Sequence, residues 1–80
     1  MNYKKIRMYL VNKRILLRYS QYKVSKDAGI SHQHYNMIEN GVVGINLSVR
    51  SLCGIADSLG MSYQEICELE KRYQKEIIGN

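Results

Sequence analysis

The stretch that decides the fold is QYKVSKDAGISHQHYNMIE, from Gln21 to Glu39. Gly29 divides it into two short segments whose apolar residues recur at helical spacing. Glycine accepts the positive φ of a tight turn between helices, and Ser25 is small where a second helix would have to cross closely. The stretch therefore predicts two short helices at a steep angle. Their contact residues are expected to be Val24, Ala28, Ile30, Tyr35 and Ile38.

Capping residues mark the helix boundaries in the rest of the chain, which contains no proline. Serine side chains accept hydrogen bonds from the free amides at a helix start, and glycine suits the left-handed position after a helix end. Serines at 20, 31, 48 and 62 and glycines at 29, 41 and 60 supply these signals, and Ser62 to Glu65 forms a capping box. They predict an all-α chain of five helices, over about 4–18, 21–28, 32–40 and 49–59 and from residue 63 onward. Residues 42–45 could be briefly extended.

The apolar stripes of these helices predict one small core. Eighty residues fit a single domain over 1–80, with its core over about 4–67 and a C-terminal helical extension over about 68–80. The apolar residues at helical spacing, besides those at 24–38, are Ile6, Leu10 and Leu17, with Val11 and Ile15 beside this stripe, then Val49, Leu52, Ile55, Ala56 and Leu59, and finally Ile66, Leu69 and Tyr73, which Ile77 could continue.

Charge is distributed unevenly along the chain. The net charge is +5, but residues 1–30 hold eight basic residues against one acid (+7), whereas residues 31–80 hold four against six (−2). A basic front predicts a polyanionic partner on one side of the molecule.

Several classes of protein do not fit this sequence. No apolar run approaches the ~18 residues that span a bilayer, and MNYKKIRMYL lacks the apolar region of a signal peptide. We therefore expect a cytoplasmic protein without a membrane partner. Cys53 and Cys67 are expected to be packing residues, with a disulfide or metal site as the alternative. His32 and His34 diverge on a helix and lack a nucleophile with an orienting acid. No metal, cofactor or enzymatic activity is expected.

Residues 6–66 resemble the helix-turn-helix family of phage repressors and Cro proteins, whose DNA-binding domain is of the xenobiotic-response-element type. The resemblance covers about three-quarters of the 80 residues. The matching pieces, in order, are Lys13-Arg14-Ile15, Ser20-Gln21, Val24, Ala28-Gly29-Ile30-Ser31, Ile38-Glu39-Asn40-Gly41, Leu52, Ile55-Ala56 and Leu59-Gly60-Met61-Ser62. The resemblance implies a compact, lambda-repressor-like five-helix fold and a homodimeric transcriptional regulator that reads a palindromic operator in double-stranded DNA.

Two positions and one segment depart from the family's pattern. Ser25 stands where alanine is common, and Tyr35 stands where a β-branched residue or leucine is common, so the Tyr35 hydroxyl needs a partner. The segment 41–47 is one or two residues longer than usual and contains no lysine or arginine.

Helix 32–40 is expected to read DNA bases through its outward face in the major groove. With Tyr35 and Ile38 inward, the 100° rotation per residue places His32, Gln33, Asn36 and Met37 for base contacts. Glutamine and asparagine can pair with adenine, histidine can contact guanine, and methionine can pack on a thymine methyl group.

The phosphate contacts must come from elsewhere, because helix 32–40 has no lysine or arginine. The resemblance implies that Gln21 holds a phosphate at the start of its helix. The other expected phosphate contacts are Lys23, Ser31, His34 and Asn40, with Arg18 and Lys26 adding charge at the rim.

The resemblance also implies a structural ion pair between Arg14 and Glu39 under the reading helix. It implies self-association through Leu59, Met61, Tyr63 and Ile66, although these residues could instead only close the monomer core. The alternative function is an antitoxin or protein-interaction module whose C-terminal helix, from Glu68, binds a partner protein.

Overall fold

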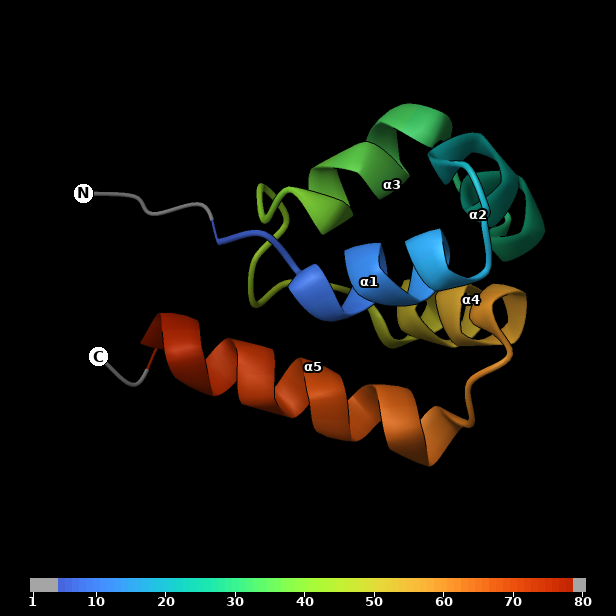
Figure 1. Ribbon diagram of the computed structural model, residues 1–80. Helices are drawn as coiled ribbons and strands as arrows, with labels where there is room; N and C mark the ends of the chain where they lie inside the picture. The colour runs from blue at the N-terminus through green and yellow to red at the C-terminus, as the bar shows by residue number, and fades with distance from the viewer. Residues whose placement is uncertain (1–4, 79–80) are drawn as a thin grey trace.

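The computed structural model describes residues 5–78 and consists of five helices. They are α1 (Met8–Leu16), α2 (Gln21–Ala28), α3 (His32–Glu39), α4 (Val49–Leu59) and α5 (Tyr63–Ile78), and no strand occurs within the described range. Helix α1 crosses the centre of the molecule, with α3 above it, α4 behind it and α5 below it (Figure 1). The all-α, five-helix prediction is confirmed.

The helix starts follow the expected serine caps. The side chains of Ser20, Ser31 and Ser48 accept hydrogen bonds from the backbone amides three residues later. Before α5, the amide of Glu65 donates to the Ser62 hydroxyl at 3.0 Å, and the Ser62 amide donates to the Glu65 carboxylate at 3.2 Å. The capping box predicted at this position is therefore present.

One apolar core joins all five helices. Its buried members are Leu10, Val24, Tyr35, Ile38, Leu52, Ile55, Ala56, Leu59, Met61 and Ile66. Helix α4 packs closely against the end of α2 at Gly54, where an added Cβ would lie 2.7 Å from the carbonyl oxygen of Ala28. Gly54 thus lets α4 support the first helix of the turn motif.

The N-terminal segment differs from the expected helix. Helix α1 starts at Met8, because the backbone amide of Arg7 donates to the carbonyl oxygen of Glu39 at 2.8 Å and the segment before it crosses the end of α3. The expected position Lys4 lies outside the described residues. Ile6 is consequently 45% exposed instead of inward.

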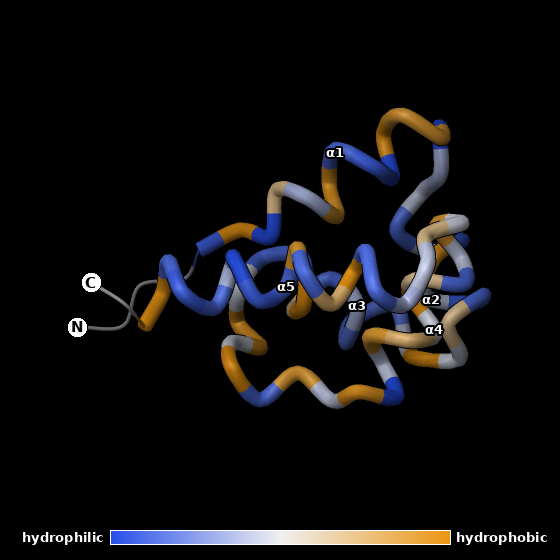
Figure 2. Tube along the Cα trace, turned by 90° about the horizontal axis from the view of Figure 1, so that it is seen from below, coloured by the Kyte–Doolittle hydropathy of each residue, from blue (hydrophilic) through white to orange (hydrophobic). Residues whose placement is uncertain are grey.

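Two further apolar residues of helices α1 and α4 are exposed. Ile15 is 60% exposed near the end of α1, and Val49 is 63% exposed at the first turn of α4. Residues 42–45 form turns and bends instead of a strand. Exposed apolar residues occur at the end of α1, at 15 and 16, and between α3 and α4, at 42 and 45. Figure 2 shows hydrophobic segments of the chain at both places. No helix in the range 5–78 has the length and apolar character needed to cross a membrane.

Candidate nucleic-acid interface

Helices α2 and α3 form a rigid pair around Gly29, which has φ +73°. The amide of Ile30 donates to the Ser25 carbonyl at 3.0 Å and so closes the turn. Ser25 is itself buried, and its hydroxyl donates to the Tyr22 carbonyl at 2.8 Å. Its polar group is therefore satisfied inside α2, which explains how serine fits where the family commonly has alanine.

The outward face of α3 carries the side chains expected to read bases. His32 and Gln33 are exposed, whereas Asn36 and Met37 are partly buried. Tyr35 and Ile38 point inward and are fully buried. The His32 ring also stacks edge-on against Tyr22, with 6.2 Å between the ring centroids. The helix thus presents a polar face at its first turn.

Asn36 is held in place by neighbours on both sides. Its Nδ2 donates to Gln21 Oε1 at 3.1 Å, and its Oδ1 accepts from Asn40 Nδ2 at 3.1 Å. Each group keeps one further hydrogen-bonding capacity, because an amide nitrogen has two hydrogens and an amide oxygen accepts two bonds. Asn36 therefore has a fixed orientation and still has a donor and an acceptor to offer.

Glu39 is the centre of the polar network under α3. Arg14 approaches it with two nitrogens, Nε to Oε2 at 2.6 Å and Nη2 to Oε1 at 3.1 Å. Gln21 Nε2 donates to Oε1 at 2.9 Å, and the Tyr35 hydroxyl donates to Oε2 at 2.7 Å. The expected Arg14–Glu39 ion pair is present, and the unusual Tyr35 finds its partner in the same carboxylate.

The network sets the protonation states of its members. Burial alone would raise the pKa of Glu39, but the hydrogen bonds from Arg14, Tyr35 and Gln21 outweigh burial and hold that pKa below its usual value. Burial and the Glu39 carboxylate raise the pKa of the Tyr35 hydroxyl, so it remains a donor. The carboxylate is thus the acceptor that connects α1, α2 and α3.

The expected phosphate contacts have different surroundings. Gln21 uses one amide hydrogen on Glu39 and its oxygen on Asn36. The Lys23 ammonium lies 3.1 Å from Asp27 and 4.8 Å from the centre of the Tyr19 ring. Ser31 caps α3 and is exposed, as is Asn40, whereas His34 is partly buried. Lys23 is half-exposed, so it remains accessible to a phosphate group.

The sequence of this region matches a known family. The Helix-turn-helix family model matches residues 10–66, more than half of the chain. This chain belongs to the helix-turn-helix family. Helices α2 and α3 occupy the motif, and the protein is a DNA-binding regulator of the Cro/C1 type. No curated protein and no solved structure shows comparable similarity.

The apolar residues expected at a dimer contact of the helix-turn-helix protein are mostly internal. Leu59 is 1% exposed, Met61 9% and Ile66 0%, and all three belong to the core. Their assignment to an interface needs correction, because buried side chains leave almost no surface for a second chain. Tyr63 remains available, at 48% exposure.

A second polar cluster of the helix-turn-helix protein lies outside the matched region and was missed from the sequence. Arg7 is fully buried and pairs with Glu70, whose carboxylate lies 2.8 Å from both Arg7 Nε and Nη2. The sequence does contain a signal for this pair, because each of the two charged residues lies on the apolar side of its segment. Cys53 and Cys67 are partly buried free thiols, and no cluster of three metal-ligating side chains occurs among residues 5–78.

Acid is expected to destabilise the helix-turn-helix protein through Glu39 and Glu70, since the pKa of each is held below the ordinary value of 4.5. Their contribution to the free energy of unfolding should be complete above about pH 5 and fall as pH drops through 4.5 toward the folded pKa values. Each carboxylate can add a slope of at most ~1.4 kcal/mol per pH unit, the limit for one proton. Urea unfolding between pH 7 and pH 3 measures this. A slope that persists in the Glu39→Gln/Glu70→Gln variant would assign it to other groups.

Proposed function

We propose that this protein is a sequence-specific transcriptional regulator that binds a palindromic operator as a homodimer. In this proposal α3 enters the major groove, and His32, Gln33, Asn36 and Met37 contact base edges. The observation that carries it is the exposed polar face of α3 on a support that the Glu39 network makes rigid. A rigidly held helix can recognise a DNA sequence because its side chains keep one geometry.

Base readout through amide side chains accounts for the composition of α3. Gln33 is exposed and has no hydrogen-bond partner among the described residues, so its amide is available for a bidentate contact with adenine. Asn36 is oriented by Gln21 and Asn40, and it would offer its remaining donor and acceptor to a base next to the one that Gln33 contacts. The exposed imidazole of His32 lies at the N-terminal turn, the part of a recognition helix that contacts bases.

Phosphate contacts would supply most of the affinity and make it depend on salt. The contacts proposed are Gln21, Lys23, Ser31, His34 and Asn40, with Arg18 and Lys26 at the rim. A dimer that neutralises roughly six to eight phosphates should lose about 10³-fold in affinity between 50 and 200 mM salt. Fluorescence anisotropy with labelled DNA over a salt series measures the slope. A flat salt response would contradict the assigned basic contacts.

The Gln33→Ala variant tests the reading face. DNA selected from random oligonucleotides by the unmodified protein supplies the probe. The variant should relax the preference at one or two base pairs and lose about 1–3 kcal/mol of binding free energy on the selected DNA. The fold should be unaffected because Gln33 is exposed.

Lys23→Ala is the matched comparison for Gln33→Ala. It removes an exposed cation that pairs with Asp27 and lies over the Tyr19 ring, and it should weaken binding to all sequences alike. A changed sequence preference in the Lys23 variant, or an unchanged one in the Gln33 variant, would refute the division between base and phosphate contacts.

The proposed dimer forms without Leu59, Met61 and Ile66, because these residues lie in the core. Two copies are proposed since a helix-turn-helix dimer reads half-sites about 34 Å apart. Sedimentation of the protein on a selected site distinguishes one bound copy from two. If only one copy is bound at saturation, the homodimer is refuted, and the protein would act as a monomer on a single half-site.

The alternative function is a protein-interaction module, with DNA binding secondary. The specific observation in its favour is the outer face of α5, where Glu68, Lys71, Arg72 and Lys75 line a shallow charged depression beyond the matched region. Replacing Lys71 and Arg72 together with alanine tests it. Loss of a co-purifying partner with DNA binding intact would favour the alternative.

A further inference from the structure

Arg7 is a fully buried cation whose donors are all used. A guanidinium has five N–H groups. Nε and one hydrogen of Nη2 bind the Glu70 carboxylate, and the other hydrogen of Nη2 binds the Gly44 carbonyl at 2.7 Å. Nη1 donates to the carbonyls of Ile38, at 2.8 Å, and Val43. Because every donor is paired, the Arg7 side chain is held in one position.

Two of the Arg7 contacts end helix α3. The last carbonyls of a helix lack partners within the helix. The Arg7 side chain binds the carbonyl of Ile38, and its backbone amide binds that of Glu39 at 2.8 Å. A cation at a helix C-terminus is also favoured by the helix dipole. Arg7 therefore caps the proposed reading helix from a distant part of the chain.

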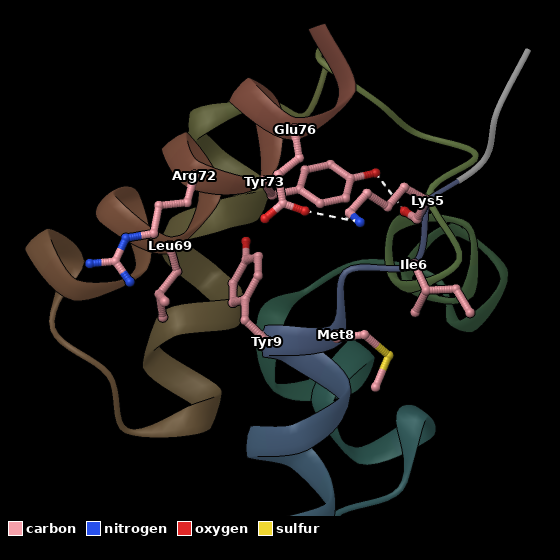
Figure 3. Close-up of a pocket in the computed structure, with 8 residues that line it drawn as sticks. All are labelled: Lys5, Ile6, Met8, Tyr9, Leu69, Arg72, Tyr73 and Glu76. Atoms are coloured by element: carbon pink, nitrogen blue, oxygen red, sulfur yellow. Dashed lines mark hydrogen bonds and ion pairs between the residues drawn. The ribbon is translucent and has the colours of Figure 1, made fainter. Parts of the chain in front are cut away.

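The C-terminal half of α5 holds Arg7 in place. Glu70 also accepts hydrogen bonds from the Tyr9 hydroxyl at 2.6 Å and from Gln74 at 2.9 Å. The guanidinium lies 4.3 Å from the centre of the Tyr73 ring. Tyr73 also donates to the Lys5 carbonyl at 2.7 Å, and Lys5 pairs with Glu76 at 2.9 Å, so the C-terminal part of α5 contacts the segment before α1 (Figure 3).

We propose that Arg7 and Glu70 are positioning residues for DNA recognition, and that the segments outside the matched region 10–66 set the geometry of α3. Arg7 connects α5 to the end of α3 and to the carbonyls of Val43 and Gly44. Neither residue is proposed to touch DNA. The inference rests on the proposed function of α3 in reading bases.

The Glu70→Gln variant of the full chain tests this proposal. Glutamine keeps the shape but removes the counter-charge of Arg7 and places an amide donor toward a guanidinium donor. The ratio of affinities for selected and scrambled DNA should fall about tenfold, the cost of about one misplaced hydrogen bond. It is measured where unfolding curves show the variant fully folded. Hydrogen exchange at the amides of Gly41, Val42 and Val43, which bond back to α3, should also accelerate.

Glu68→Gln is the matched control, because it makes the same charge change at an exposed position on α5. Its affinity ratio and exchange rates should match those of the unmodified protein. An equal drop in both variants would assign the effect to charge, and a normal ratio in folded Glu70→Gln would reduce the cluster to a stabilising role. Either result overturns the proposal.

A milder pair of variants covers the case in which Glu70→Gln does not fold. Tyr73→Phe removes only the hydrogen bond to the Lys5 carbonyl, and it should lower the affinity ratio about threefold. Gln64→Ala, at an exposed position of the same helix, should not. Unchanged ratio and exchange in Tyr73→Phe would overturn the proposal. If the unmodified protein shows no DNA preference, the proposed function fails, and hydrogen exchange alone still decides whether α5 positions α3.

Discussion

Replacing Gly41 with alanine is expected to lower the free energy of unfolding by about 4 kcal/mol or more, which is close to the whole stability of a small domain. Gly41 has φ +78°, where a side chain is strained. An added Cβ would also lie 2.1 Å from the Lys5 carbonyl oxygen and 2.7 Å from its carbon. Both atoms belong to the backbone, so the segment before α1 would have to leave the end of α3.

Gly60→Ala separates the two causes of this loss. Gly60 has φ +66°, but an added Cβ would meet nothing within 4 Å. Gly60→Ala should therefore lower the free energy of unfolding only by the strain of a side chain at positive φ, about 1–2 kcal/mol. Urea unfolding followed by circular dichroism measures both variants. An equal loss of unfolding free energy in the two variants would contradict the close contact between residues 5 and 41.

Replacing Glu39 with alanine is expected to cost about 3–5 kcal/mol, the range for removing one partner of a buried ion pair. The Glu39 side chain is 3% exposed, and that of Arg14 is 16% exposed. Its loss leaves Arg14 without a counter-charge and the buried hydroxyl of Tyr35 without its acceptor. Chemical unfolding of the variant gives the number directly.

Asp27→Ala is the appropriate control for the Glu39 variant. Asp27 also pairs with a cation, Lys23 at 3.1 Å, but that pair is exposed, and exposed ion pairs contribute little to stability. A Glu39 variant that loses no more than the Asp27 variant would contradict the central role given to the carboxylate. Thermal shifts of the two proteins in one buffer make the comparison.

Much of the helical framework could be predicted from local signals. Serine caps and glycine ends act within a few residues, so α2 and α4 begin and end where the sequence indicates. The start of α1 could not be predicted in this way. Its boundary depends on the bond between the Arg7 amide and Glu39, a contact between residues far apart in sequence.

The two buried ion pairs show what pattern reasoning finds and misses. Arg14 interrupts the apolar face of its helix, and family resemblance supplied Glu39 as its partner. Arg7 lies seven residues before Arg14, a spacing equal to about two helical turns, and Glu70 lies between Ile66 and Tyr73 on α5. A charge on an apolar face indicates a buried partner, but spacing could not join residues 63 positions apart.

Apolar character also could not separate the core from an interface. Leu59, Met61 and Ile66 satisfy either role equally well in a sequence, and only packing places them inside. Conversely, Val49 continues the apolar stripe of α4 and yet is largely exposed, because the first turn of that helix extends past the core.

The pairing of Arg7 with Glu70 has a consequence for the order of events during synthesis. Residue 7 leaves the ribosome long before residue 70, and an unpaired guanidinium stays in water because burying it alone costs several kcal/mol. The carbonyls at the end of α3 therefore lack their arginine until α5 has emerged. A nascent chain can form the helices of the turn motif first, but the Arg7 contacts to the end of α3 are complete only after Glu70 has left the ribosome.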